Sequence, residues 1–351
     1  MRRPRDTGLL PRVTVDPIFI VESVCAAAQV APTVKDLSNE LRQTGIQRAI
    51  QKRDTPKLFD WLIERFSYQG TSDAAVETFI ARHGNVSYGD VATAIDRFDC
   101  RCPKLSSFTA YVACGYRKTA QTCAEPQFIG SCPVPSHDLR NGNLNRLAYS
   151  LYFFLRDVCH DDLTGFIDQT LEASDCAGHP DRLARMRAAL LNRLRAIHSA
   201  SDKILSMTFA DLLIAGDPDR PRWKEVGASM IAVDSLVHAF LHRTAILHRL
   251  HSQHAYGPAC YGKDGCASVI DRLARQIDAR TYDPEFPAYF PRFIQYSIWT
   301  FCAQQGLDIC NGNRIDDSAR CRQQNCCLFS KCGRIPLRWT DGREPKARAP
   351  P

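Results

Sequence analysis

The chain has 351 residues, 44% of them hydrophobic, and a formal net charge of +7 from 45 lysines and arginines against 38 acidic residues. Its length allows one large core or two ordinary ones, and no apolar run reaches membrane length, which excludes an integral membrane protein. No apolar segment with a cleavage site follows the arginine-rich first residues, so we expect a soluble, unexported cytoplasmic protein, nucleoid-associated if bacterial.

Helical periodicity dominates the chain, and we expect an all-α protein. Helices are predicted over 17–29 and 34–52. Pro56, at a first-turn position, opens a helix that runs to Phe66, and Ser72 or Asp73 caps another that runs to about Arg82. The segment 100–136 is irregular, because prolines and cysteines interrupt it throughout.

Beyond that segment, apolar residues recur at helical spacing from Asn143 to Val158, then around the basic stretch 181–196, and again through Leu213. Residues 216–229 are rich in proline and glycine, and we expect a loop there. The apolar run Ile231–Val233 then delivers Asp234 to the start of another amphipathic helix.

Two more helices are predicted at 267–279 and 293–304, and strand-type alternation is scarce throughout. We therefore divide the chain into an N-terminal helical extension (1–55), a helical core (56–99 and 137–250), a cysteine-rich insert (100–136), C-terminal helices with a cysteine loop (251–332) and a disordered basic tail (333–351).

Sixteen cysteines in a chain without an export signal favour metal ligation over disulfides. Near the C-terminus, gaps of ten, four and five residues separate Cys310, Cys321, Cys326 and Cys332, and Cys327 is a rival for Cys326. Four thiolates in a compact loop suit zinc or a [4Fe–4S] cluster, since both take tetrahedral sulfur ligation.

The insert contains the other cysteine group: Cys100, Cys102, Cys114, Cys123 and Cys132. Its spacing matches no standard zinc pattern. The insert has few apolar residues with which to hold itself together, so we expect a second metal site between Cys100 and Cys132.

Asp234 has two interpretations. An acidic residue at the start of a helix can cap free backbone N–H groups, and it can also be held in its ionised form facing a cleft. The net positive charge of the chain suits a polyanionic partner such as nucleic acid.

Four local patterns resemble the helix-hairpin-helix DNA glycosylases of the endonuclease III superfamily. Phe66–Asp73 is similar to the family's Ser-x-Gln-x-Thr-Asp segment, with one residue extra, and Ile197–Lys203 lies where the family has Leu-Pro-Gly-x-Gly-x-Lys. Ile231–Asp234 is similar to the family's (Ile/Pro)-x-Val-Asp run, with Arg243 nine residues further on. The C-terminal cysteines resemble the family's iron–sulfur loop, with longer first and second gaps.

The resemblance implies two helical subdomains that flank a DNA-binding cleft, and a monomeric enzyme that acts on double-stranded DNA. The enzyme would hydrolyse the N-glycosidic bond of a flipped-out damaged or modified base. Asp234 would be the catalytic carboxylate, and Lys203 would be the Schiff-base lysine of an AP lyase.

The same resemblance assigns DNA contacts to Gln69, Ser199, Ser201 and Arg243, and a structural [4Fe–4S] cluster to Cys310, Cys321, Cys326 and Cys332, with zinc as the alternative. The chain departs from the family where Ser199 and Ser201 replace the hairpin glycines. Two other functions remain open: chemistry on hypermodified thymine in DNA, and metal-stabilised DNA binding without catalysis.

Overall fold

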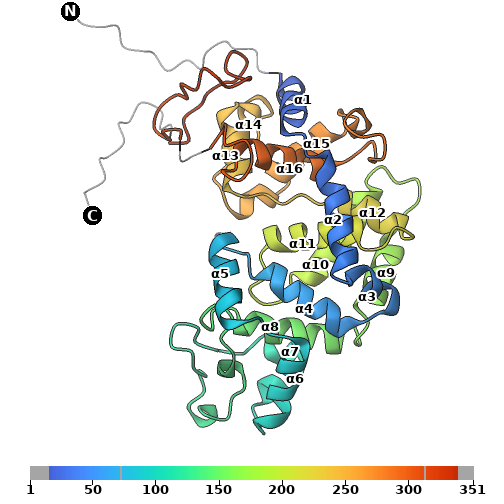
Figure 1. The fold of residues 1–351 in the computed structure, drawn as a ribbon, viewed down its shortest axis with the longest axis vertical. Helices are drawn as coiled ribbons and strands as arrows, with labels where there is room; N and C mark the ends of the chain where they lie inside the picture. Colours follow the sequence, from blue (N-terminus) through green and yellow to red (C-terminus); the bar gives the residue numbers. More distant parts are fainter. Residues whose placement is uncertain (1–15, 72, 312–313, 339–351) are drawn as a thin grey trace, which may run out of the picture. The chain divides into compact units, whose positions relative to one another are not determined.

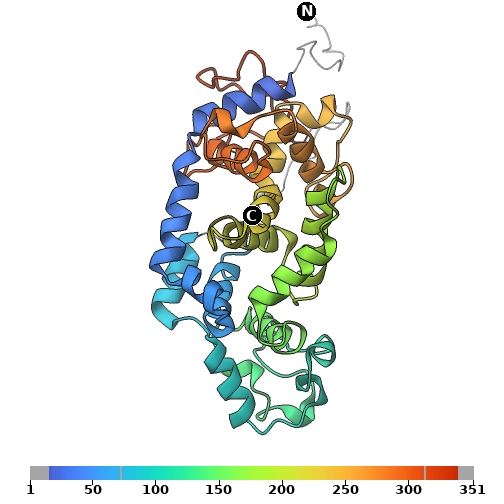
Figure 2. The same ribbon diagram turned by 90° about the vertical axis from the view of Figure 1, so that its right-hand side faces the viewer.

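The computed structural model describes residues 16–71, 73–311 and 314–338 (Figures 1 and 2). Within these ranges the regular structure is helical, and an isolated antiparallel bridge between Arg117 and Thr122 is the one β-type pairing. The expected all-α class is therefore confirmed for this part of the chain. No helix in it is both long and apolar enough to cross a membrane.

The described residues form two compact units. The first unit holds the chain up to Thr33 and from Ile231 onward, and the second holds Val34–Met230. These divisions differ from those expected at 55/56 and 250/251. The reason is long-range packing: helix α1 (Pro17–Ala28) lies against helix α16 (Pro291–Cys302), and a contact between such distant segments leaves no local signature in the sequence.

The second unit is organised around α4 (Thr55–Phe66), which buries Leu58, Leu62 and Phe66. Asp54 caps this helix by accepting from the backbone N–H of Lys57 at 3.1 Å, and Pro56 occupies its first turn. The other helices of this unit are α2 (Ala31–Gln43, which crosses the division), α3 (Ile46–Lys52), α5 (Asp73–His83), α6 (Tyr88–Arg97), α7 (Phe108–Tyr111), α8 (Asn145–Phe153), α9 (Leu163–Ser174), α10 (Arg182–Leu194), α11 (Asp202–Ala215) and α12 (Pro221–Ser229).

Two local predictions were wrong in this unit. The single helix expected over 34–52 is two helices, because Gly45 takes the left-handed conformation (φ 79°) between α2 and α3. The loop expected over 216–229 contains α12. Pro221 is compatible with the first turn of that helix, and burial of Trp223 against the unit's core stabilises it.

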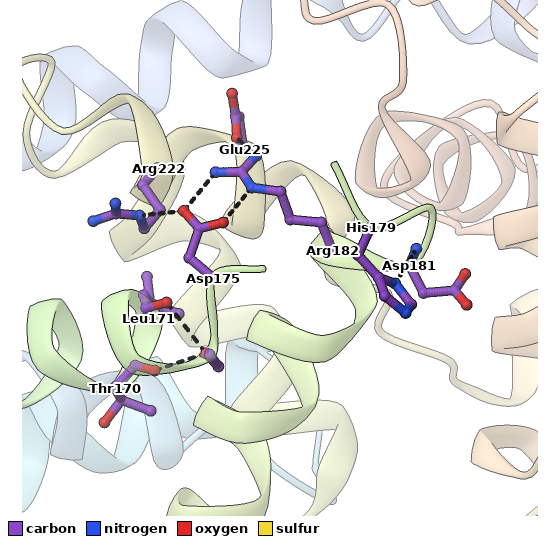
Figure 3. A network of polar contacts seen from close by, with 9 residues as sticks. Thr170, Leu171, Asp175, His179, Asp181, Arg182, Arg222 and Glu225 are labelled. Carbon is purple, nitrogen blue, oxygen red and sulfur yellow. Dashed lines mark hydrogen bonds and ion pairs between the residues drawn. The ribbon is translucent and has the colours of Figure 1, made fainter. Parts of the chain in front are cut away.

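An ion-pair network joins α9, α10 and α12 (Figure 3). Asp175, just beyond α9, accepts from Arg182 at 2.8 Å and from Arg222 at 2.9 Å, and Arg182 also donates to Glu225 at 2.7 Å. Hydrogen bonds from Arg182, and then from Arg222, lower the pKa of Asp175 to about 2. The carboxylate form of Asp175 therefore helps to hold these three helices together.

The first unit contains α1, α13 (Ser235–Arg243), α14 (Ile246–Arg249), α15 (Cys266–Ala274) and α16. Helix α16 packs against α1, α13 and α15, so it forms the centre of this unit. Figure 1 shows α13, α14, α15 and α16 drawn together in the yellow-to-red part of the chain.

The chain after α16 returns to α13. The backbone N–H of Ile335 donates to the carbonyl of Arg243 at 2.9 Å, and that of Arg338 donates to the carbonyl of Asp317 at 2.9 Å. Residues 333–338 of the expected disordered tail are therefore packed onto the unit, with Ile335 only 5% exposed. The remainder of that tail, 339–351, lies outside the described residues.

Candidate functional site

Asp234 occupies the N-terminus of α13, and 9% of its surface is exposed. Its Oδ1 accepts from the backbone N–H of Val237 at 2.9 Å, so it caps the helix. The backbone N–H of Val233 donates to the Tyr261 hydroxyl at 2.8 Å. Hydrogen bonds therefore hold the chain on both sides of Asp234.

The four cysteines predicted as ligands lie around one cavity, which we call the four-cysteine cavity: Cys310, Cys321, Cys326 and Cys332. Phe240 of α13 and Phe301 of α16 form part of its wall. Cys327 is exposed and is not among the lining residues, so the structure places Cys326 at the cavity.

The thiols of this cavity lie close enough to influence one another. Burial raises the pKa of Cys332 to about 12, and the neighbouring Cys310, Cys326 and Cys321 add to the rise. The backbone N–H of Arg334 lies 3.4 Å from the Cys332 sulfur and acts in the opposite direction. Such N–H···S contacts are also used to stabilise thiolate ligands around metal centres.

Arg243 was expected to contact DNA, but its side chain is only 2% exposed and lines the four-cysteine cavity. One guanidinium nitrogen pairs with Asp317. Within the described residues its Nε and Nη1 have no hydrogen-bond partner. A buried cation with unmet donors fits an anionic group in the cavity, as metal-bound thiolates would provide.

A second group of possible ligands includes one residue of α13 and three residues that follow it in the chain, and it was not predicted from the sequence. His238 of α13, His254, Cys260 and Cys266 have ligand atoms that all lie within 4.8 Å of one another, and we call them the His/Cys group. His238 is 8% exposed, and Cys260 and Cys266 are fully buried. This group could hold a metal ion.

Contacts within the His/Cys group are short. The Cys266 sulfur lies 3.3 Å from Nδ1 of His238 and 3.3 Å from Nε2 of His254, and the Cys260 sulfur lies 3.6 Å from Nδ1 of His238. A hydrogen bond from Cys266 lowers the pKa of Cys260 to about 3, with smaller effects from the two histidines. The group therefore already favours one thiolate.

No other set of three or more possible ligands among the described residues lies within 4.8 Å of one another. The four cysteines that line the four-cysteine cavity are therefore not drawn together as closely as the His/Cys group.

The five cysteines of the insert lie near one another in the second unit. Burial raises the pKa of Cys132 to about 12, with Cys123 and Cys100 adding to it. Burial also raises the pKa of Cys102, with Cys100, Cys123 and Cys114 adding to it. Apolar packing contributes more than the sequence suggested, since Phe108 and Tyr111 of α7 are buried and contact Phe154 and Phe153.

The predicted hairpin residues belong to the second unit and connect α10 to α11. Ser201 caps α11 by accepting from the backbone N–H of Ile204 at 3.4 Å, and Lys203 lies in the first turn of that helix. Ser199 is exposed and has φ 65°, the left-handed conformation that favours glycine. The turn thus has a glycine-type backbone at a serine.

Gln69 lies in the turn after α4, also in the second unit, and is partly exposed. Arg140 donates to the carbonyls of Ser67 at 3.0 Å and of Gln69 at 2.6 Å, so it fixes the backbone of this turn. Arg140 and the next two residues, Asn141 and Gly142, all have positive φ. Consecutive residues of this kind are costly and persist only where tertiary contacts hold them.

The candidate residues thus fall into two sets. Asp234, Arg243, the four-cysteine cavity and the His/Cys group belong to the first unit, while Gln69, Ser199, Ser201 and Lys203 belong to the second. Comparisons with protein-family models, curated proteins and solved structures found no match.

Proposed function

We propose that this protein is a DNA glycosylase that hydrolyses the N-glycosidic bond of a flipped-out damaged or modified base in double-stranded DNA. The observation that carries the proposal is the structure of α13. This helix of nine residues has the candidate carboxylate at its N-terminus and lines the four-cysteine cavity at its C-terminal end. The combination agrees with the resemblance to the endonuclease III superfamily.

The chemistry requires a carboxylate that remains ionised next to the sugar. As the bond to the base breaks, positive charge develops on the sugar, and a fixed negative charge stabilises it. The contacts on Val233 and Val237 keep the position of Asp234 fixed at the N-terminus of α13.

The hairpin between α10 and α11 would bind a DNA phosphate. The N-terminus of a helix attracts anions, here that of α11, and the Ser199 and Ser201 hydroxyls would add donors. Gln69 would contact the DNA near the extruded nucleotide, from a turn that Arg140 holds in place.

Lys203 would add AP-lyase activity. In its neutral form its Nζ condenses with the C1′ aldehyde of the abasic sugar and releases water, and elimination of the 3′ phosphate then breaks the strand. The resulting imine can be trapped covalently with borohydride. Trapping by the parent protein, and none by Lys203→Gln, is the expected result.

The four-cysteine cavity would hold a [4Fe–4S] cluster through Cys310, Cys321, Cys326 and Cys332. The buried Arg243, with donors that lack a partner in the described residues, suits an anionic metal–thiolate centre, and the resemblance to the family favours the cluster over a single zinc ion. Such a cluster would have a structural role, since it would fix the chain after α16 against α13.

Asp234→Asn tests the proposal, because asparagine caps a helix as well as aspartate and only the charge is lost. On duplexes with uracil, thymine glycol, oxidised purine, a mismatch or hypermodified thymine, we expect base release by the parent protein and a loss of roughly 10²–10³-fold in the variant, with unchanged thermal stability. Asp54→Asn, at the cap of α4, is the matched control and should retain full activity.

Two outcomes would contradict the proposal. Salt-dependent DNA binding without base release from any of these substrates would favour a non-catalytic DNA-binding protein. Equal activity of Asp234→Asn and the parent protein would remove Asp234 from the mechanism.

A further inference from the structure

We propose that the His/Cys group binds one zinc ion, and that this ion fixes the position of the N-terminal part of α13. The group consists of His238, His254, Cys260 and Cys266, which are separated in the chain by fifteen, five and five residues. This spacing is not a standard zinc-binding pattern, so the sequence alone does not show that the four residues meet. Folding of the first unit brings them together, around a single point inside it.

The donor set and its dimensions fit zinc. With Zn–S near 2.3 Å and Zn–N near 2.0–2.1 Å, tetrahedral geometry places nitrogen and sulfur ligands about 3.5–3.6 Å apart. The three N···S distances in the group are 3.3, 3.3 and 3.6 Å. Two thiolates and two imidazoles form one of the usual ligand sets of structural zinc sites.

The convergence of the four ligands excludes the other common centre with two cysteines and two histidines. A Rieske-type cluster places the cysteines on one iron and the histidines on another. In this protein the Cys266 sulfur lies 3.3 Å from both His238 and His254, so thiolate and imidazole would share the same ion.

Hydrogen bonding prepares His254 to be a ligand. Its Nδ1 lies 2.7 Å from the carbonyl oxygen of Ser252, and a carbonyl can only accept, so Nδ1 carries the proton. Nε2 then has its lone pair available, and it is Nε2 that faces Cys266. Metal-bound histidines in proteins usually have such a partner on the other ring nitrogen.

The ion would connect α13 to the segment that supports Asp234. His238 is one helical turn beyond Asp234, and its backbone N–H donates to the Asp234 carbonyl at 3.0 Å. Cys260 is followed directly by Tyr261, whose hydroxyl accepts from the Val233 N–H. The metal would therefore fix both the first turn of α13 and the backbone before Asp234. The site does not depend on whether the chain cleaves DNA.

Metal analysis of the full-length protein and its variants tests this inference. We expect His254→Ala and Cys260→Ser each to contain one equivalent of zinc per chain less than the parent protein. The iron content of all three proteins should be the same. Cys176→Ser, which changes a partly exposed cysteine outside every group described above, should retain all of its zinc.

Cobalt gives a spectroscopic readout. Co²⁺ exchanged into the parent protein should show the d–d bands of a tetrahedral site and thiolate charge-transfer bands from two sulfurs. His254→Cys should still bind cobalt and should show stronger charge transfer, because it supplies a third thiolate. Zinc content that is the same in the parent, His254→Ala and Cys260→Ser proteins, or a cobalt spectrum that is unaffected by His254→Cys, would overturn the assignment.

Discussion

Replacing Ser199 with glycine should stabilise the protein, although glycine usually destabilises. Ser199 has φ 65° and an exposed side chain, so its left-handed backbone is a cost that no packing offsets. A non-glycine residue in this region costs about 1–2 kcal/mol, and the greater freedom of glycine in the unfolded chain returns roughly 0.5–1 kcal/mol of that. We therefore expect a net gain of about 0.5–1 kcal/mol.

Thermal unfolding measures this effect. For a domain of this size the gain corresponds to a rise in Tm of roughly 1–4 °C. Ser201→Gly is the matched control in the same turn, because Ser201 has φ −79° and caps α11. Losing that cap to glycine should cost a few tenths of a kcal/mol, so Tm should fall slightly. If Ser199→Gly lowers Tm as Ser201→Gly does, the turn does not have the backbone described above.

Three other predictions concern the cysteines and the ion pairs. Anaerobically purified protein should show the broad visible absorption of a [4Fe–4S] cluster, which Cys326→Ser should abolish and Cys327→Ser should leave intact; equal loss in both variants would contradict the lining of the cavity. Stability should fall as the pH drops from about 4 towards 2, because Asp175, whose folded pKa is lowered to about 2, then loses its charge. Asp175→Asn should reduce the loss of unfolding free energy between about pH 4 and pH 2 by on the order of 1 kcal/mol. The same loss in the variant and the parent protein would refute this role of Asp175. If the insert holds a metal, Cys102→Ser should lower both the metal content and the Tm of the protein. If neither changes, apolar packing around Tyr111 stabilises the insert instead.

The sequence predicted the helical class well, because that class depends on a strong local signal. Apolar residues at helical spacing identify a helix wherever they occur, and the gaps between Cys310, Cys321, Cys326 and Cys332 are short enough for a single loop to bring them together. The wrong prediction of a loop over 216–229 also has a local cause. Composition alone does not distinguish a proline that breaks a helix from Pro221, which begins one.

The His/Cys group was missed because fifteen residues separate one ligand, His238, from the next and the spacing matches no standard zinc pattern. One signal was present: five of the ten histidines lie between His238 and His254, just before Cys260. Arg243 was misleading for a similar reason. Its position in the sequence suggests a DNA contact, while its burial results from Asp317 and the cysteines, which come much later in the chain.

Helix α13 explains why these features occur together. His238 and Arg243 are five residues apart, which separates their directions by about 140° around the helix axis. One side of the helix therefore faces the His/Cys group and another faces the four-cysteine cavity, with Asp234 at the N-terminus. A short helix has little stability of its own, so contacts at both positions are needed to fix it. Two metal centres on different sides of one helix would hold the carboxylate at its N-terminus more rigidly than either centre alone.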